Sequence, residues 1–220
     1  MTYVIVSLDR SRSGPLLRAL RGARLLPPLV HPWGSHRAYE ELLTEPRSLA
    51  ILDVPDERWR PGLEHRVGLL RRLAPVIALV PEGTDAADLL DAGADNVLTR
   101  NMPIQELAVR LATERRSLAS ATPVPHAQVS PPASMLPHHG SQRLLLRLLL
   151  TDRQPWCCHD LSRLLGTAEQ PLNRAALRAR LDRLSSCLEP LGLALTRSGA
   201  WKRLFYTVVP LAGNRAITGS

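Results

Sequence analysis

The chain has 220 residues, of which 45% are hydrophobic and only 4% are aromatic. This composition excludes an intrinsically disordered chain and indicates two domains of roughly 100 residues each, with cores of Leu, Val, Ile and Ala. The net charge of +8 favours a polyanionic partner or an acidic membrane surface. Met1 leads directly into a strand-like run, and no uncharged apolar run approaches the roughly 18 residues that cross a bilayer. We therefore expect neither a signal peptide nor a membrane span.

The net positive charge is concentrated in the last third of the chain. Residues 1–118 carry 16 basic and 15 acidic side chains, whereas residues 142–220 carry 12 basic and 5 acidic ones. A nucleic-acid partner is therefore expected to contact the C-terminal part.

The first 118 residues alternate between short apolar runs, typical of buried parallel strands, and segments with helical spacing. The predicted strands cover residues 3–8, 29–31, 48–55, 75–81 and 96–99. The predicted helices cover residues 14–26, 35–43, 61–73, 84–92 and 103–118. This alternation predicts an α/β fold with a doubly wound, five-stranded parallel sheet. Asp53 lies at the C-terminal end of the third strand, where functional groups gather in such sheets.

Residues 119–140 are predicted to form a proline-rich, semi-rigid linker. We interpret its histidines, His126, His138 and His139, as solvated side chains and expect no metal site. The three cysteines, Cys157, Cys158 and Cys187, have the spacing of neither a disulfide framework nor a zinc site, which favours a reduced, cytoplasmic protein. For the adjacent pair, packing in a core is favoured over redox sensing.

The C-terminal third has the pattern of three helices followed by a β-hairpin, the plan of a winged-helix domain. The helices are predicted at residues 141–150, 159–165 (closed by Gly166) and 171–188, and the hairpin at 193–209, with a tight turn at Ser198–Gly199. In the third helix, an apolar stripe is formed by Leu177, Leu181, Leu184 and Leu188. The opposite face carries small residues flanked by Arg178 and Arg183, which can reach phosphates or guanine edges.

Several segments resemble one family of regulators. AGADNVLTRNMPIQELAVRL (Ala92–Leu111) resembles the end of a response-regulator receiver domain, and LAILDVP resembles the strand that carries its phosphoacceptor. LLLRLLLTDRQPWCCHDLSRLLG and RARLDRLSSCLEPLGLALTRSGAWKR resemble the effector domain of the OmpR/PhoB subfamily. The resemblance implies a receiver-like domain over residues 1–118, the linker over 119–140, and a winged helix-turn-helix DNA-binding domain over 141–220.

The receiver part departs from the family pattern at most of its functional positions. Where the family has two metal-binding acids after the first strand, this chain has Ser7 and Leu8, with only Asp9 adjacent. Val80 replaces a hydroxyl residue, and Arg100 replaces a lysine. Phosphoryl transfer to a carboxylate needs a metal ion and a cation beside the product, so we expect no conventional phosphorylation and no cofactor. The degenerate phosphoacceptor pocket comprises Ser7, Leu8, Asp9, Asp53, Val80 and Arg100.

The resemblance also implies surfaces for DNA and for a second copy of the chain. The residues expected to contact DNA are Asn173, Arg174, Arg178, Arg180, Arg183, Arg197, Lys202 and Arg203. The family pairs through the fourth helix, fifth strand and fifth helix of the receiver. The charged residues expected on this dimer face are Asp88, Asp95, Arg110 and Arg115.

The leading interpretation is a cytoplasmic, bacterial, sequence-specific DNA-binding transcriptional regulator and homodimer that acts without phosphorylation. A small-molecule effector in the pocket, or a partner protein, is a further possibility. Two alternatives stay open: a conventional response regulator phosphorylated on Asp53, with Asp9 as its metal-binding acid, and a winged-helix module that binds protein. No glycine-rich phosphate loop and no nucleophile constellation is found, so an enzyme is not expected.

Overall fold

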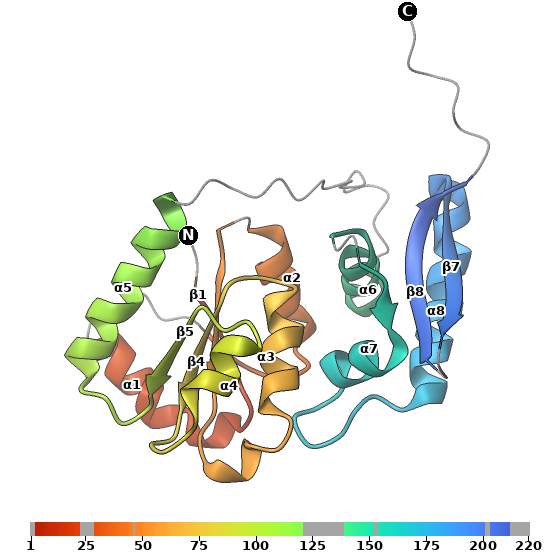
Figure 1. Cartoon of the computed structure of the whole chain (residues 1–220). Helices are drawn as coiled ribbons and strands as arrows, with labels where there is room; N and C mark the ends of the chain where they lie inside the picture. Colours follow the sequence, from red (N-terminus) through yellow and green to blue (C-terminus); the bar gives the residue numbers. More distant parts are fainter. Residues whose placement is uncertain are drawn as a thin grey trace, which may run out of the picture. The chain divides into compact units, whose positions relative to one another are not determined.

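The computed structural model describes residues 3–22, 29–45, 47–120, 139–151, 154–200 and 203–211. The chain divides into two compact units, which are taken separately (Figure 1). The first contains the described residues up to 120, and the second contains most of those from 139 onward. The predicted linker lies largely outside the described residues, together with His126 and His138.

The N-terminal unit is an α/β structure with a five-stranded parallel sheet in the order β2-β1-β3-β4-β5. Its strands are β1 (Tyr3–Ser7), β2 (Val30–Pro32), β3 (Leu49–Asp53), β4 (Val76–Val80) and β5 (Asn96–Thr99). Strands β3 and β4 are buried along their whole length, as expected for the interior of a parallel sheet. The predicted α/β class and parallel sheet are confirmed.

Helices connect the strands, and short polar side chains cap several of them. They are α1 (Gly14–Gly22), α2 (His36–Thr44), α3 (Leu63–Arg71), α4 (Ala86–Asp91) and α5 (Ile104–Ser120). Ser35 caps α2 by accepting from the Ala38 N–H, and Asp85 caps α4 by accepting from the Ala87 N–H. These bonds satisfy backbone donors that a helix N-terminus leaves unpaired.

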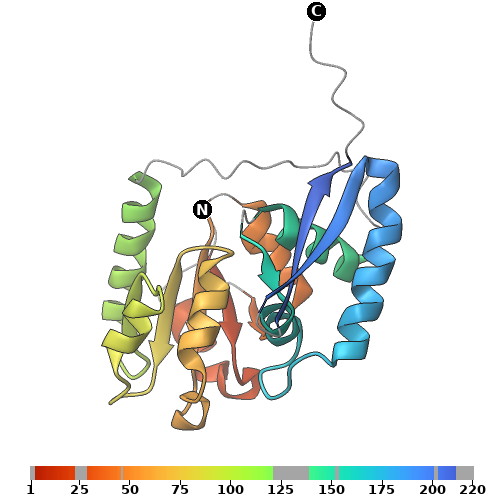
Figure 2. The same cartoon turned by 45° about the vertical axis from the view of Figure 1, so that its right-hand side comes forward.

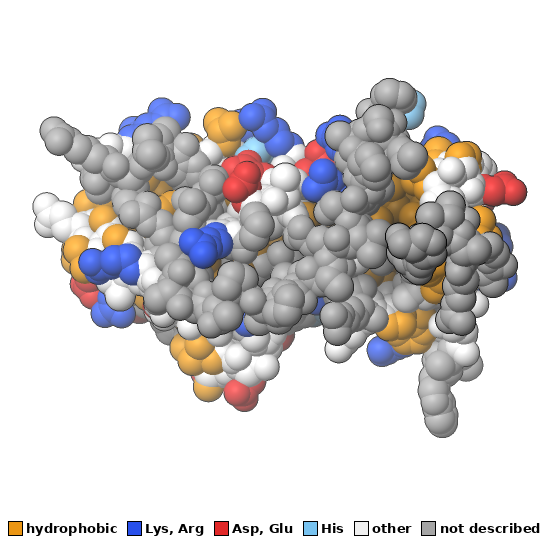
Figure 3. Space-filling model, turned by 90° about the horizontal axis from the view of Figure 1, so that it is seen from above, with side chains coloured by type: hydrophobic (Ala, Val, Ile, Leu, Met, Phe, Trp, Pro, Cys, Tyr) orange, Lys and Arg blue, Asp and Glu red, His pale blue; other side chains and the backbone are white. Residues whose placement is uncertain are grey.

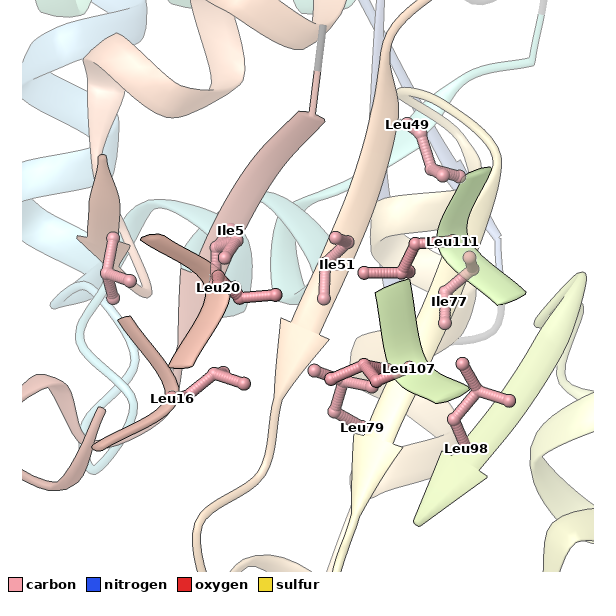
Figure 4. Packing of buried hydrophobic residues seen from close by; sticks show 11 residues of the cluster. Ile5, Leu16, Leu20, Leu49, Ile51, Ile77, Leu79, Leu98, Leu107 and Leu111 are labelled. Atoms are coloured by element: carbon pink, nitrogen blue, oxygen red, sulfur yellow. The ribbon is translucent and has the colours of Figure 1, made fainter. Parts of the chain in front are cut away.

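Alternation along the strands divides the core between the two faces of the sheet. Figure 4 shows the face on which Ile5, Ile51 and Ile77 pack against leucines of α1 and α5. Helices α2, α3 and α4 lie on the other face (Figure 1). Since side chains alternate with a period of two, Ser7 and Asp53 belong to the face of Ile5 and Ile51. They stand at the carboxyl ends of neighbouring strands.

The C-terminal unit combines three helices with a three-stranded antiparallel sheet in the order β6-β8-β7. In chain order its elements are α6 (Gly140–Thr151), β6 (Trp156–Cys157), α7 (Cys158–Leu165), α8 (Arg174–Leu188), η4 (Glu189–Leu191), β7 (Leu193–Ala200) and β8 (Arg203–Pro210). Figure 2 shows the long β7–β8 hairpin running beside α8.

The third helix of this unit begins later than predicted. Helix α8 starts at Arg174 rather than at Pro171, because the Asn173 side chain caps it by accepting from the Ala175 N–H. The segment before it folds back onto α7, where the Leu172 N–H donates to the Ser162 carbonyl oxygen at 2.7 Å. Gly166 permits this fold, since a Cβ there would lie only 2.5 Å from the Leu172 nitrogen. Gly166 closes α7 as predicted, with extended backbone.

The predicted hairpin turn at Ser198–Gly199 is wrong. Strand β7 continues through these residues, with Ser198 opposite Phe205 and Gly199 opposite Leu204. The last pair is Ala200 with Arg203, so the strands are joined by residues 201–202, which lie outside the described residues. A Ser-Gly pair is a turn signal, but continued cross-strand pairing outweighs it here.

None of the helices described for this chain is long and apolar enough to span a bilayer.

Candidate functional site

The first candidate site lies at the carboxyl edge of the parallel sheet, around Asp53. Ser7 and Asp53 are opposite each other in the pairing of β1 with β3, and the Ser7 hydroxyl donates to Asp53 Oδ2 at 3.0 Å. The Ser13 hydroxyl, just before α1, donates to the same oxygen at 2.6 Å. Asp53 is 0% exposed.

Arg100 neutralises this buried carboxylate. Its Nε donates to Asp53 Oδ1 at 2.8 Å, and its Nη2 donates to the Arg12 carbonyl oxygen at 2.6 Å. The Arg100 side chain itself is only 19% exposed. Both oxygens of Asp53 are therefore occupied by protein donors, in a charge-assisted arrangement that is among the stronger kinds of hydrogen bond.

The remaining predicted pocket residues lie at the same edge of the sheet. Leu8 and Val80 are each 2% exposed, and the Leu8 N–H donates to the Asp53 carbonyl oxygen at 3.0 Å. The Asp9 N–H donates to the Ser7 hydroxyl oxygen at 3.2 Å. The structure thus brings Ser7 and Arg100 into contact with Asp53, and it buries Leu8 and Val80.

A second layer of ion pairs lies at the same edge of the sheet and is more exposed than Asp53. Arg58 Nη2 lies 2.5 Å from Asp9 Oδ2 and its Nε lies 3.3 Å from Asp56 Oδ1, while Arg12 Nη1 lies 2.7 Å from Asp56 Oδ2. The hydrogen bond from the Ser11 hydroxyl lowers the pKa of Asp9, and the charges of Arg58 and Arg12 lower it further. Asp9 is therefore ionised and paired with Arg58 of its own chain.

Sequence reasoning missed Ser13, Arg12, Asp56 and Arg58 in this site. Arg12 lies in the short 3-10 helix η1 (Arg10–Arg12), and Arg58 lies in a second one, η2 (Glu57–Trp59). Each follows a strand of the parallel sheet, and carboxyl ends of parallel strands share one edge. The shared edge would have placed η1 and η2 near Asp53. It does not, however, predict which of their side chains form ion pairs.

The second candidate site is the outer face of α8. Leu177, Leu181, Leu184 and Leu188 are all buried, at most 3% exposed, so the predicted apolar stripe holds the helix to its unit. Arg174, Arg178 and Arg183 are exposed. None of these three forms an ion pair with a carboxylate in the part of the chain that the structure describes.

Arg180 differs from the other arginines of α8. It is half-buried, and its carbonyl oxygen accepts a hydrogen bond from Gln142 Nε2 of α6 at 3.4 Å. Burial lowers the pKa of the Arg180 guanidinium, and the neighbouring charge of Arg183 lowers it further. Arg180 therefore lies at the edge of the exposed face, toward α6. Asn173, also expected to contact DNA, uses its side-chain oxygen as the helix cap.

The hairpin adds two exposed arginines to this part of the molecule. Arg197 and Arg203 are exposed on β7 and β8, whereas Lys202 lies outside the described residues. Arg197 stands opposite Tyr206. Burial raises the pKa of Tyr206, and the charges of Arg197 and Arg178 counteract that rise. The phenol is therefore within electrostatic reach of both α8 and the hairpin.

The residues expected on the dimer face are partly engaged within the chain. Asp95 accepts from the Val76 N–H at 2.7 Å and pairs with Arg71 at 3.4 Å. Arg110 pairs with Glu106 at 2.8 Å. Asp88 is exposed, and the side chain of Arg115 lies outside the description.

The cysteines and the acidic residues give no metal centre within the described ranges. Cys157 is buried, Cys158 half-buried and Cys187 exposed, and all three are free thiols. Among the described residues, no three His, Cys, Asp or Glu side chains are grouped to hold a metal ion.

Comparison with known proteins leaves the family open. No protein-family model matches the chain, and no curated protein matches it. In the face drawn in Figure 3, visible Lys and Arg side chains (blue) occur in several places. The candidate interface is defined by the exposed arginines of α8 and the hairpin.

Proposed function

We propose that this protein is a sequence-specific DNA-binding transcriptional regulator of the OmpR/PhoB type, whose receiver-like unit acts without phosphorylation of Asp53. The observation that carries the proposal is the outer face of α8. Its arginines are exposed and unpaired with carboxylates of the described chain, while four buried leucines hold the helix in place. Exposed arginines on a rigid helix suit phosphate contacts and guanine edges.

The remaining elements of the C-terminal unit support a winged helix-turn-helix interpretation. Helices α6, α7 and α8 are followed by the β7–β8 hairpin, and the short strand β6 pairs with β8. In such domains the third helix enters the major groove, and the hairpin reaches the neighbouring backbone. Arg197 and Arg203 would then contact phosphates, which position the protein without reading sequence.

The state of Asp53 supports action without phosphorylation. A carboxylate that attacks a phosphoryl donor must present an oxygen to it. Asp53 is fully buried, and its two oxygens accept from Ser7, Ser13 and Arg100. Asp9, the acid that the alternative mechanism needs as a metal ligand, is paired with Arg58.

DNA binding is tested by selecting a randomised double-stranded oligonucleotide pool with the purified full-length chain and measuring the affinity of the selected sequence. We expect binding without any phosphodonor and a steep loss of affinity between about 50 and 200 mM salt. Arg178→Ala and Arg183→Ala should weaken this binding. Arg71→Ala, which removes an exposed arginine of the N-terminal unit, is the control of equal charge.

Absence of salt-sensitive DNA retention would favour the alternative that the C-terminal unit binds protein.

The conventional alternative, phosphorylation of Asp53, is tested with acetyl phosphate and Mg²⁺. A stable acyl phosphate on Asp53 would contradict phosphorylation-independent action, whereas we expect none, and we expect Asp53→Asn to keep DNA binding.

We further propose a cytoplasmic homodimer that pairs through α4, β5 and α5. Exposed acidic side chains on α4 and arginines on α5 offer complementary charge across a two-fold axis. Arg110 would have to exchange its Glu106 partner for one on the second copy. A strictly monomeric chain at high concentration and low salt would contradict this.

A further inference from the structure

Charged side chains join three separate loops at the carboxyl edge of the parallel sheet. The loop after β1 supplies Asp9 and Arg12, the loop after β3 supplies Asp56 and Arg58, and Arg100 follows β5 directly. Together with Asp53, these side chains form a set of three acids and three arginines. The set is neutral by itself, so burial of Asp53 leaves no uncompensated charge.

The set has two layers that differ in exposure. In the inner layer, Arg100 binds the fully buried Asp53 and, through its second nitrogen, the Arg12 carbonyl oxygen. In the outer layer, Arg12 and Arg58 have side chains 57% and 56% exposed. Exposed pairs contribute little and are screened by salt, whereas buried pairs are screened much less. Removal of one partner should therefore cost more in the inner layer than in the outer one.

Arg100 also fixes the corner where β5 passes into α5. Its backbone N–H donates to the Val80 carbonyl oxygen at 2.8 Å, and the Met102 N–H donates to the Thr99 carbonyl oxygen at 3.2 Å. Two hydrogen bonds from one planar guanidinium hold this corner to the ends of β3 and of the β1 loop. A shift of the corner would break both bonds.

We propose that these six side chains form an ionic clamp in which the Asp53–Arg100 pair, with Arg100 as the positioning residue, fixes the β5–α5 corner in one conformation without a metal ion or a phosphoryl group. The clamp would explain how the receiver-like unit keeps one conformation without phosphorylation. This role in regulation rests on the function proposed above. The residues that form the clamp are Asp9, Arg12, Asp53, Asp56, Arg58 and Arg100.

The clamp is tested by hydrogen exchange of backbone amides in the full-length chain, read by mass spectrometry over residues 96–107. In Arg100→Gln we expect exchange at this corner to accelerate about tenfold or more, as loss of charge-assisted hydrogen bonds implies. Arg100→Lys keeps the charge beside Asp53 without the planar fork, so it should restore part of the protection. Arg71→Gln is the matched control, since it breaks an exposed ion pair with Asp95 just before β5.

A folded Arg100→Gln chain with wild-type exchange at the corner would overturn the clamp. Equal acceleration in Arg71→Gln, or acceleration spread evenly over the whole unit, would show general destabilisation and would also overturn it. Should Arg100→Gln not fold, Arg100→Lys and Asp53→Asn decide: we expect partial acceleration at the corner, and wild-type exchange in both contradicts the proposal.

A second arm adds millimolar MgCl₂ to the wild-type chain. We expect unchanged exchange at the corner, because the acids of the edge are already paired with arginines. Slower exchange with Mg²⁺ would show that a metal ion completes the site, and would overturn the clamp. Neither arm uses DNA, so a chain that fails to bind DNA refutes the proposed function and leaves the test of the clamp intact.

Discussion

Arg100 and the arginines on the outer face of α8 have different environments in this protein. At the carboxyl edge of the parallel sheet, Arg100 is mostly buried and bound to the Asp53 carboxylate. On the outer face of α8, Arg178 and Arg183 are exposed and form no ion pair with the described carboxylates. Because the residue type is the same, burial and partners decide what each guanidinium can do.

The comparison separates an edge whose charges are paired within the chain from a surface whose arginines are exposed to solvent. A mostly buried guanidinium that is bound to a carboxylate of its own chain has to give up part of that ion pair before its charge can serve a ligand. An exposed guanidinium with unused donors is available to a phosphate, and no internal bond opposes binding. The clamp therefore predicts stability effects, and the α8 face predicts effects on binding.

The largest expected effect is a loss of stability when the buried Asp53–Arg100 ion pair is broken. Arg100→Gln leaves Asp53 without its counter-charge, and we expect the free energy of unfolding of the N-terminal unit to fall by about 3 kcal/mol. Urea unfolding, with exchange of the β3 amides as the probe, measures this unit alone. Adding Asp53→Asn should cost less than the sum of the two single effects, since the partners are coupled. Additive effects would mean that the pair contributes nothing as a pair.

The second effect concerns DNA affinity and should leave stability unchanged. Arg178→Ala or Arg183→Ala is expected to cost about 1–3 kcal/mol of binding to a selected sequence. A phosphate contact would also reduce the slope of affinity against salt by about one unit, whereas a base contact would relax sequence preference. Unchanged affinity in both variants would remove α8 as the interface.

The stability of the N-terminal unit should depend on pH through His31. Burial lowers the pKa of His31, with Arg37 and Arg10 lowering it further and Glu41 opposing them. The unfolded chain therefore binds the proton more readily, so the stability of the N-terminal unit should fall as pH drops below the ordinary histidine value of 6.5. His31→Gln should flatten this dependence when unfolding is followed between about pH 5 and 7. The same slope in wild type and variant would assign it to another group.

The smallest effect is expected in the outer layer of the clamp. Arg58→Gln breaks an ion pair with Asp9 that is largely exposed, so we expect a loss of unfolding free energy below about 1 kcal/mol. High salt should remove the difference between variant and wild type, because exposed pairs are screened. An effect as large as that of Arg100→Gln would erase the distinction between the two layers.

Local sequence determined which segments form the parallel sheet and which face of α8 is buried. Short apolar runs and helical spacing located all five strands, placed Asp53 at a strand end, and identified the leucine stripe that the structure buries. These features depend on side-chain periodicity within a segment, which the sequence contains directly. The hairpin turn was missed because pairing between two strands, not the Ser-Gly dipeptide, decides where the chain reverses.

Only the tertiary structure decided which charges meet. Asp53, Arg100 and Ser13 come from distant positions, and their contact depends on the order of strands and on how each loop crosses the sheet edge. Likewise, the leucine stripe on α8 follows from helical spacing in the sequence. The half-burial of Arg180, however, depends on where α6 packs. Periodicity acts over a few residues, whereas ion pairing is set by distances that exist only once the chain is folded.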